Sequence, residues 1–325
     1  MNRFSTVLLG PVLLLGLLLS LNPQPQAKEQ AIKLTEEKEG FICPVFSPDG
    51  QSIAMTREGW AGIWRMSSDG TGLKELTPDP GSGYQFAWSP NSRYIAYRTD
   101  AYVDGKRHFA IRVVDVKTGN MEEITEFERF LGTPRWVLGD GTIVFETDRD
   151  GALAQALVVG LVSSQDTGEP DRLVATTSHD LQIWISGPDG REKTLISDPQ
   201  QRCFAPSVSP QGDRVCYTVL DGGGSIAVAR TDGSDQRNLG YGSNPCWSPD
   251  GQYLAYEVTA DDGMTMTGSD LFLINVDGTD RTQLTDTPDL MERWPNWSPD
   301  GGKMVFSAGG AIYVMSIPTT IISGE

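Results

Sequence analysis

The stretch "CWSPDGQYLAY", at residues 246–256, joins an aromatic residue, Ser-Pro-Asp-Gly and a short apolar run that ends in tyrosine. Proline fixes φ at the second position of a turn and glycine adopts the left-handed conformation, so Ser-Pro-Asp-Gly predicts a tight turn between two strands. The same pattern recurs along the chain, as "VFSPDGQSIAM" (45–55), "AWSPNSRYIAY" (87–97), "SVSPQGDRVCY" (207–217), "NWSPDGGKMVF" (296–306) and the degenerate "RWVLGDGTIVF" (135–145).

The spacing of these copies predicts the architecture. The serines of the five full copies, with Val137 in the same slot of the degenerate one, follow one another at intervals of 42, 48, 72, 39 and 50 residues. Repeats of this length hold four short strands each, as β-propeller blades do. Beyond the N-terminal apolar run the chain shows no helical periodicity, which predicts few helices. Six copies therefore predict an all-β fold, a six-bladed β-propeller of four-stranded antiparallel blades.

Two segments do not follow the simple repeat. The segment "ALVVGLVSSQDTGEPDRLVATT" (156–177) delays the third strand of its repeat, and we interpret it as an inserted hairpin at about 148–178. A truncated extra blade is the alternative. The last repeat lacks a fourth strand, and Ala31–Thr35 matches the fourth-strand pattern, so this N-terminal strand is predicted to complete the last blade. Thr320–Ser323 is the other candidate for that place.

The N-terminus resembles a targeting signal. Arg3 precedes an apolar run of 15 residues, Val7–Leu21, which is short for a membrane span and typical of a secretory signal. We expect residues 1–27 to be a signal peptide, with cleavage after Ala27, and residues 28–325 to be the propeller. An uncleaved anchor is the alternative. Four cysteines in an exported chain could pair, but their slots and apolar neighbours favour buried free thiols: Cys43, Cys203, Cys216 and Cys246.

The repeat "WSPDG…IAY…IW…DG…LT" resembles the TolB-type, WD-like β-propeller repeat, over roughly residues 31–316. Such repeats occur in the periplasmic protein TolB, whose propeller binds a peptidoglycan-associated lipoprotein, and in the propellers of prolyl-oligopeptidase-like enzymes. Neither the α/β domain of TolB nor a hydrolase domain is recognisable here. The resemblance therefore implies a periplasmic or otherwise extracytoplasmic module that binds a protein or peptide of the cell envelope.

Charge and composition narrow the partners. The formal net charge of −17 disfavours nucleic acid and anionic membrane surfaces as partners. His108 and His179 are the two histidines of the chain and make a poor metal site, so we expect no catalytic residues, no bound metal and no cofactor, in a monomer. The alternative is a propeller enzyme, a polysaccharide lyase or hydrolase with a metal bound in its channel.

Candidate binding residues gather on one predicted face. Length variation is concentrated in segments that join strand two to strand three, at 99–108, 147–180 and 259–270, and such variation marks a binding face. Trp60 and Trp294 fit no repeat slot and are predicted to lie in loops there, beside residues of the loops between blades. The predicted partner-binding set is Trp60, Tyr84, Arg129, Arg202, Arg293 and Trp294. Arg293 and Trp294 lie outside the core slots, so replacing these two residues is expected to leave the stability of the fold unchanged.

Export is the first testable prediction. Cell fractionation should place the protein outside the cytoplasmic membrane, and N-terminal sequencing should find the mature chain beginning near Lys28. An intact chain in the membrane would favour the anchor, and an intact chain in the cytosol would contradict export altogether.

Overall fold

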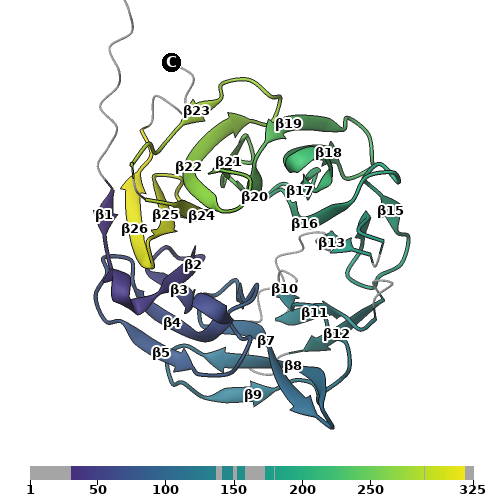
Figure 1. Ribbon diagram of the computed structural model, residues 1–325. Helices are drawn as coiled ribbons and strands as arrows, with labels where there is room; N and C mark the ends of the chain where they lie inside the picture. The colour runs from purple at the N-terminus through teal and green to yellow at the C-terminus, as the bar shows by residue number, and fades with distance from the viewer. Residues whose placement is uncertain are drawn as a thin grey trace, which may run out of the picture.

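The computed structural model describes residues 31–136, 141–148, 152–157, 173–178, 180–288 and 290–318. Within these residues the strands form seven antiparallel sheets, arranged as blades around a common centre (Figure 1). The prediction of an all-β propeller is confirmed, but the predicted number of six blades is wrong. The signal peptide predicted at residues 1–27 lies outside the described residues.

Five blades have four strands. In chain order, blade 1 contains β2 (Phe41–Phe46), β3 (Ser52–Arg57), β4 (Ala61–Ser67) and β5 (Lys74–Thr77). Blade 2 contains β6 (Ala87–Trp88), β7 (Tyr94–Val103), β8 (Lys106–Asp115) and β9 (Met121–Glu123). Blade 5 contains β16 (Cys203–Val208), β17 (Arg214–Val219), β18 (Ser225–Arg230) and β19 (Arg237–Tyr241). Blade 6 contains β20 (Ser243–Trp247), β21 (Tyr253–Asp261), β22 (Met266–Asn275) and β23 (Thr282–Gln283). Blade 7 contains β24 (Glu292–Trp297), β25 (Lys303–Ala308), β26 (Ala311–Ser316) and the N-terminal β1 (Ile32–Lys33).

The remaining two blades show three strands each within the described residues. Blade 3 contains β10 (Arg135–Trp136), β11 (Thr142–Glu146) and β12 (Leu153–Leu157). Blade 4 contains β13 (Val174–Thr177), β14 (Ile183–Ser186) and β15 (Thr194–Leu195). Three single-turn 3₁₀ helices complete the described elements: η1 (Glu37–Glu39), η2 (Glu58–Trp60) and η3 (Asp221–Gly223).

The segment interpreted as an inserted hairpin explains the missing blade. β12 pairs with β11 over five residue pairs and so is a strand of blade 3. β13 pairs instead with β14, in a separate sheet. The two strands therefore do not form a hairpin, and the truncated extra blade is the arrangement observed. The count from sequence fails because it relies on the Ser-Pro-Asp-Gly turn, and the described part of blade 4 contains no such turn.

The recurring turn is held by its own side chains. In blade 1, the Ser47 hydroxyl donates to Asp49, and Ser47 Oγ accepts the Ser52 amide at 2.9 Å. Asp49 Oδ1 also accepts the Gln51 amide at 3.0 Å. Gly50 has a φ of +70°, the left-handed conformation that favours glycine. These bonds satisfy the polar groups of a buried turn, because Ser47 has no exposed surface.

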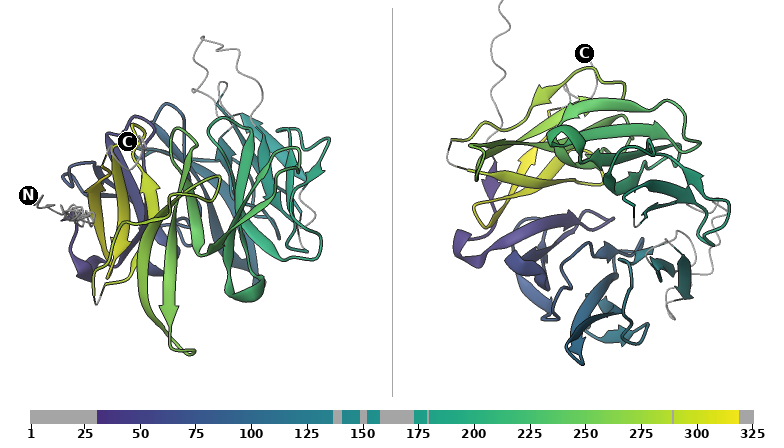
Figure 2. Two further views of the ribbon diagram at one scale, coloured as in Figure 1. Left: turned by 90° about the horizontal axis from the view of Figure 1, so that it is seen from above. Right: turned by 45° about the vertical axis from the view of Figure 1, so that its right-hand side comes forward.

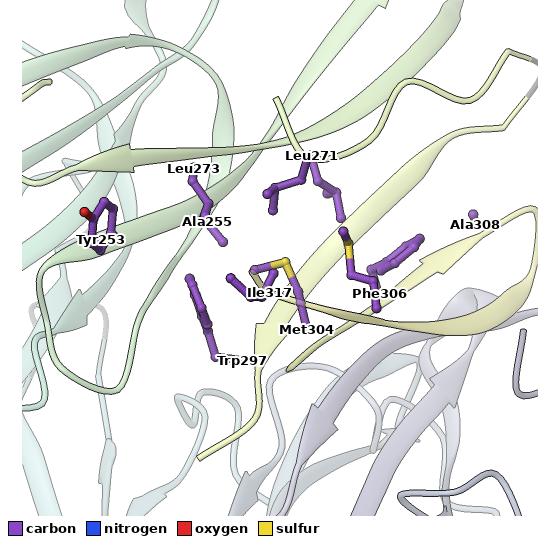
Figure 3. Close-up of a cluster of buried hydrophobic side chains, with 11 residues drawn as sticks. Tyr253, Ala255, Leu271, Leu273, Trp297, Met304, Phe306, Ala308 and Ile317 are labelled. Carbon is purple, nitrogen blue, oxygen red and sulfur yellow. The ribbon is translucent and has the colours of Figure 1, made fainter. Parts of the chain in front are cut away.

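The tryptophan before the turn links neighbouring blades. The indole N–H groups of Trp88, Trp136 and Trp247 each donate to a carbonyl oxygen in the first strand of the preceding blade. The acceptors are Val45, Ala87 and Ser207, at 3.2, 2.9 and 2.9 Å. Apolar side chains pack between the sheets at the same level. Figure 3 shows such a cluster between blades 6 and 7, in which Leu271 and Leu273 face Met304 and Phe306. The aromatic residue of the motif is thus part of the core.

The N-terminal strand closes the ring. In β1, Ile32 pairs with Val314 and Lys33 with Tyr313 of β26. The Leu34 amide then donates to Ile312 O at 2.7 Å, and the Ile312 amide donates to Thr35 Oγ1 at 2.9 Å. The prediction that Ala31–Thr35 completes the last blade is confirmed. The other candidate, Thr320–Ser323, lies outside the described residues.

Two hairpins extend beyond their sheets on one side of the ring. β7 and β8 pair over ten positions up to Val103 and Lys106, and β21 and β22 pair up to Asp261 and Met266. The segments 99–108 and 259–270, predicted as loops, are therefore mostly paired strand. The two hairpins project on the same face, because both join strand two to strand three. The view in Figure 2 shows the hairpin of blade 6 extending past its neighbours.

Closure by β1 generates a stability prediction. Deleting Ala31–Thr35 should lower the melting temperature strongly, because it leaves the N–H and C=O groups of β26 without their partners. Ile32→Ser is the matched control, since 64% of Ile32 is exposed and its backbone pairing is kept. Thermal unfolding of wild type and the two variants measures the difference. Equal melting temperatures for wild type and the deletion would contradict this role for β1.

Candidate functional site

One face of the ring carries most of the exposed apolar surface. We define the variable face as the side formed by the connections between strands two and three of a blade, and between strand four and the next blade. Of the ten exposed large hydrophobic side chains in the described residues, seven lie there: Tyr84, Tyr102, Val103, Leu220, Tyr241, Met264 and Met291. Ile32, Leu73 and Met121 lie elsewhere. Apolar side chains gathered on one face are typical of an interaction surface.

Three aromatic residues of the predicted set meet on this face. The ring centroid of Trp60, at the end of η2, lies 5.3 Å from that of Tyr84 and 6.4 Å from that of Trp294. Both pairs are edge-to-face, the arrangement that aromatic quadrupoles favour. The three residues come from blade 1, from the connection between blades 1 and 2, and from blade 7. We call Trp60, Tyr84 and Trp294 the aromatic cluster.

Trp294 lies in a strand, which corrects its prediction as a loop residue. It sits in β24, at the bulge where pairing with β25 shifts between Arg293 and Asn296, and its φ is +54°. Cys43, Ala205 and Asn244 have the same left-handed backbone at the corresponding bulges. Trp294 therefore fills a repeat slot, the one before a proline in the first strand. Left-handed backbone is strained for a bulky residue, so its surroundings must stabilise it.

Buried Glu257 supplies that support. Its side chain has no exposed surface, and Oε1 accepts the backbone N–H of Trp294 and the Asn244 amide, the latter at 2.9 Å. Arg293 Nε lies 3.3 Å from Oε2, and the same guanidinium stacks on the Trp294 ring at 4.2 Å. Burial raises the pKa of Glu257, while Arg293 and the hydrogen bonds from Trp294 and Asn244 oppose the rise. The carboxylate thus fixes the backbone that presents Trp294.

Glu257 belongs to a polar slot that recurs in strand two. In each repeat with the turn motif, the residue after the strand's aromatic or methionine is polar: Thr56, Arg98, Glu146, Thr218, Glu257 and Ser307. Five of these are buried, and Arg98 is half-buried. Two of them bond to the segment that leads into the next blade or begins it: Glu257 at Trp294 and Arg98 at Leu131. This slot was not predicted from the sequence, although its alternation of apolar and polar residues is visible in the repeats.

A cleft of about 490 Å³ opens beside the aromatic cluster, between blades 1 and 2. Its walls come from the η2 turn, the connection between the blades and the β7–β8 hairpin: Gly59, Trp60, Ala61, Pro80, Gly81, Tyr84, Arg98, Asp100, Arg107 and Phe109. Its volume is in the range of small-molecule and side-chain binding pockets. The cleft therefore combines aromatic surface with two guanidinium groups and one carboxylate.

The two arginines of the cleft differ in their partners. Arg107 makes a two-point ion pair with Asp100, at 2.9 and 3.0 Å. Arg98 donates to the Leu131 carbonyl oxygen at 2.7 Å, and no carboxylate of the described residues lies within ion-pair distance of it. Its guanidinium lies over the rings of Phe109 and Tyr84, at 4.5 and 5.5 Å. Burial lowers the pKa of Arg98, but a guanidinium stays charged at neutral pH.

The structure brings only part of the predicted set together. Arg293 touches Trp294 of the aromatic cluster but is paired with Glu257. Arg129 donates to the Arg107 carbonyl oxygen at 3.1 Å, at the edge of the cleft. Arg202 pairs with Asp221 in blade 5, and 64% of its side chain is exposed. Two of the three predicted arginines are thus matched by carboxylates, which weakens the local positive charge expected from the sequence.

The remaining residues considered from sequence are placed as follows. His108 lies in β8, with Nδ1 at 2.9 Å from Lys106 O, and His179 lies outside the described residues. The described parts of the chain contain no group of three or more His, Cys, Asp or Glu side chains that could hold a metal ion. The four cysteines are free; Cys203 and Cys216 are buried as expected, whereas Cys43 and Cys246 are partly exposed.

Comparison with known families identifies the repeat. The family model described as the TolB beta propeller domain matches residues 172–320. Residues 172–320 thus carry the TolB-type propeller repeat. The resemblance noted in the sequence is thereby confirmed, and the matched range runs from blade 4 to the end of blade 7.

Solved structures agree on the fold. The β-propeller domain of Cps50 (Swd1) from Myceliophthora thermophila superposes with a TM-score of 0.56 at 11% identity, covering 89% of this chain and 98% of that one. An oligogalacturonate lyase from Vibrio parahaemolyticus gives 0.51 at 14% identity, covering 91% and 96%. A TolB-like protein from Agrobacterium tumefaciens gives 0.50 at 19% identity, covering 86% and 90%. At these identities the likeness establishes the propeller and leaves the activity open.

The Glu257–Arg293 pair changes an expectation from the sequence. Arg293→Ala should destabilise the fold by roughly 2–3 kcal/mol, because it leaves a buried carboxylate without its cation. The cost should stay below that of a fully buried pair, since 31% of the Arg293 side chain is exposed. Chemical denaturation of the variant and wild type measures the difference. An unchanged stability would contradict the assigned role of Glu257.

The same pair predicts a pH dependence. Without Arg293 the folded-state pKa of Glu257 rises further above its unfolded value. Between these two pKa values, Glu257 is protonated in the folded state and ionised in the unfolded state. The deficit of Arg293→Ala should be smallest below the unfolded pKa of glutamate and should grow as pH rises through the folded pKa. Adding Glu257→Gln is the matched control, since glutamine still accepts the Trp294 amide but carries no charge. The double variant should recover stability and lose this pH dependence.

Proposed function

We propose that this propeller is a protein-binding module of the cell envelope, whose variable face binds a polypeptide partner through the aromatic cluster. The observation that carries the proposal is the gathering of seven of ten exposed large hydrophobic side chains on that face. Tryptophan and tyrosine are the residues that most often anchor protein interfaces. The opposite face, made of tight turns, offers no comparable group among the described residues.

The backbone of the cluster supports a binding role. Trp60 and Trp294 both have left-handed φ, of +61° and +54°, which is unfavourable for bulky side chains. At Trp294 this conformation belongs to the bulge that recurs at Cys43, Ala205 and Asn244, so the repeat itself supplies a rigid scaffold for the side chain. Here the scaffold is the bulge of β24 with its bond to Glu257, and it keeps Trp294 ordered before a partner arrives. Preorganised aromatic residues lose little conformational entropy on binding.

The proposed location follows from the sequence and the family. A predicted signal peptide at residues 1–27 and a TolB-type propeller both fit a periplasmic protein. Among the described residues, no helix has the length and apolar character needed to cross a membrane.

A second candidate function is an enzyme that acts on an acidic polysaccharide. The cleft favours it, because it holds aromatic surface, an arginine without a carboxylate partner and the carboxylate of Asp100. The likeness to an oligogalacturonate lyase concerns the fold and suggests the substrate to try first. Incubation with oligogalacturonate separates the candidates: formation of unsaturated, ultraviolet-absorbing products would support the lyase, and intact substrate would favour the binding module.

The binding proposal predicts a split between capture and stability. With the mature chain as bait in envelope extract, Trp60→Ala should weaken capture of the partner at least about ten-fold, because anchor residues commonly contribute above 1 kcal/mol. Quantitative mass spectrometry identifies the partner, and titration of the purified pair gives the affinity. The melting temperature should stay close to that of wild type, since Trp60 is partly exposed.

Two controls make the test specific. Tyr84→Ala and Leu73→Ala remove side chains of nearly equal exposure, 38% and 40%, from opposite faces, so only Tyr84→Ala should weaken capture. Trp247→Ala should instead destabilise the fold by roughly 3–5 kcal/mol, as loss of a buried tryptophan does. Full capture by Trp60→Ala and Tyr84→Ala would contradict the proposal.

A further inference from the structure

We propose that the cleft between blades 1 and 2 is a carboxylate-binding site, in which Arg98 binds an acidic side chain of the polypeptide partner. This inference rests on the proposed function and adds to it the chemistry of the group that is recognised. Arg98 was not among the residues predicted from sequence.

Arg98 is held in place as an anion ligand. One N–H group donates to Leu131 O at 2.7 Å, and the guanidinium lies over Phe109 and Tyr84. These contacts fix the guanidinium plane while using only one of its five N–H donors. No nitrogen of Arg98 is among the buried polar atoms that lack a partner in the described residues. The other N–H groups are therefore accessible from the cleft that Arg98 lines.

The neighbouring charges leave Arg98 as the available cation. Asp100 is only two residues away but is engaged by Arg107 through both carboxylate oxygens. This pair is packed closely against the turn at Gly81, where a side chain would overlap Asp100 Oδ1 and where φ is +68°. Asp100 is thus paired with Arg107, and no ion pair joins it to Arg98, although its charge still acts on that guanidinium. Arg98 is therefore the arginine that lines the cleft without a carboxylate partner among the described residues. Arg129, at the edge of the cleft, has no such partner either but is outside its lining, whereas Arg202 and Arg293 are both paired.

The cleft and its surroundings favour a peptide. Tyr102 is 74% exposed and pairs with Arg107 in the β7–β8 hairpin, so its side chain lies on the same side of the hairpin as Arg107, beyond the lining of the cleft. An exposed aromatic side chain at this position offers a contact for a residue that flanks the acidic side chain. A sugar ring needs a broad, free aromatic face. The Tyr84 ring already meets Arg98 on its ring face and Trp60 edge-to-face, which leaves less of it for stacking.

The test uses blocked peptides with the purified mature protein. The probe is acetyl-Ala-Glu-Phe-amide, the neutral control is its glutamine counterpart, and trigalacturonate represents acidic sugars. Calorimetric titration and the intrinsic tryptophan fluorescence of the protein report binding. The glutamate peptide should bind at least about ten-fold more tightly than the glutamine peptide, and its affinity should fall as salt is raised.

Two variants assign the effect to the cleft. Arg98→Gln should remove the preference for glutamate over glutamine, as judged only on protein whose melting temperature shows that it folds. Asp100→Asn provides an independent arm, because it frees Arg107 and removes a negative charge, and it should strengthen binding of the glutamate peptide several-fold. Arg237→Gln is the matched control on a paired arginine of blade 5, at the start of β19 on the opposite face, and should change nothing.

Each outcome of these experiments either supports or contradicts the inference. Equal binding of both peptides, an unchanged preference in folded Arg98→Gln, weaker binding in Asp100→Asn, or tighter binding of trigalacturonate than of the peptide would overturn the inference. Failure here is distinguishable from failure of the proposed function. If Trp60→Ala weakens capture while the two peptides bind equally, the variable face binds a partner but the cleft does not distinguish a carboxylate from an amide.

Discussion

The structure depends on the pairing that closes the ring. Each blade packs an apolar layer against both neighbours, as the cluster shared by blades 6 and 7 shows, so an open ring would expose two such layers at once. Strand β1 contributes two residue pairs with β26, together with the bonds from Leu34 and to Thr35. Both β1 side chains are exposed, so its own contribution rests on backbone hydrogen bonds. Blades 1 and 7 add the side-chain burial at this junction, where Phe41 and Phe46 pack in one cluster with Ile312.

The core and the variable face are connected through the polar slot of strand two. Glu257 is inside the protein, yet its bonds fix the backbone of Trp294 on the face; Arg98 occupies the same slot in blade 2 and lines the cleft. One position of the repeat therefore carries a buried structural carboxylate in one blade and an accessible guanidinium in another. The physical difference is the partner: Glu257 meets Arg293 and two amide donors, whereas Arg98 meets a single carbonyl oxygen and two aromatic rings. Variation of a slot beneath a constant backbone allows a repeat fold to acquire a specific surface.

The sequence predicted those features that local chemistry determines. Ser-Pro-Asp-Gly specifies its turn through Ser47, Asp49 and Gly50 alone, so the fold class, the strand pairs and the closing strand could be read from the repeats. The seventh blade could not, because β13–β15 carry no copy of that turn and their sheet is recognised only through its pairing. The site was predicted in part. Trp60, Tyr84 and Trp294 were all predicted as binding residues, but the bulge that holds Trp294 cannot be read from composition. Arg98 was missed because its position depends on long-range contacts with Leu131 and Phe109.

The closing strand also has a consequence for the order of assembly. Thr35 and Ile312 are 277 positions apart, so the first segment of the propeller to be synthesised bonds to one of the last. Until the final blade exists, β1 has no partner, and until β1 arrives, β26 presents an open edge to any other strand. Contacts of such long range form slowly, because the loop that separates them must close first. Until the ring closes, the folding chain therefore exposes the unpaired edges of both β1 and β26. A chaperone that covers β-strand edges would protect the chain most during this period.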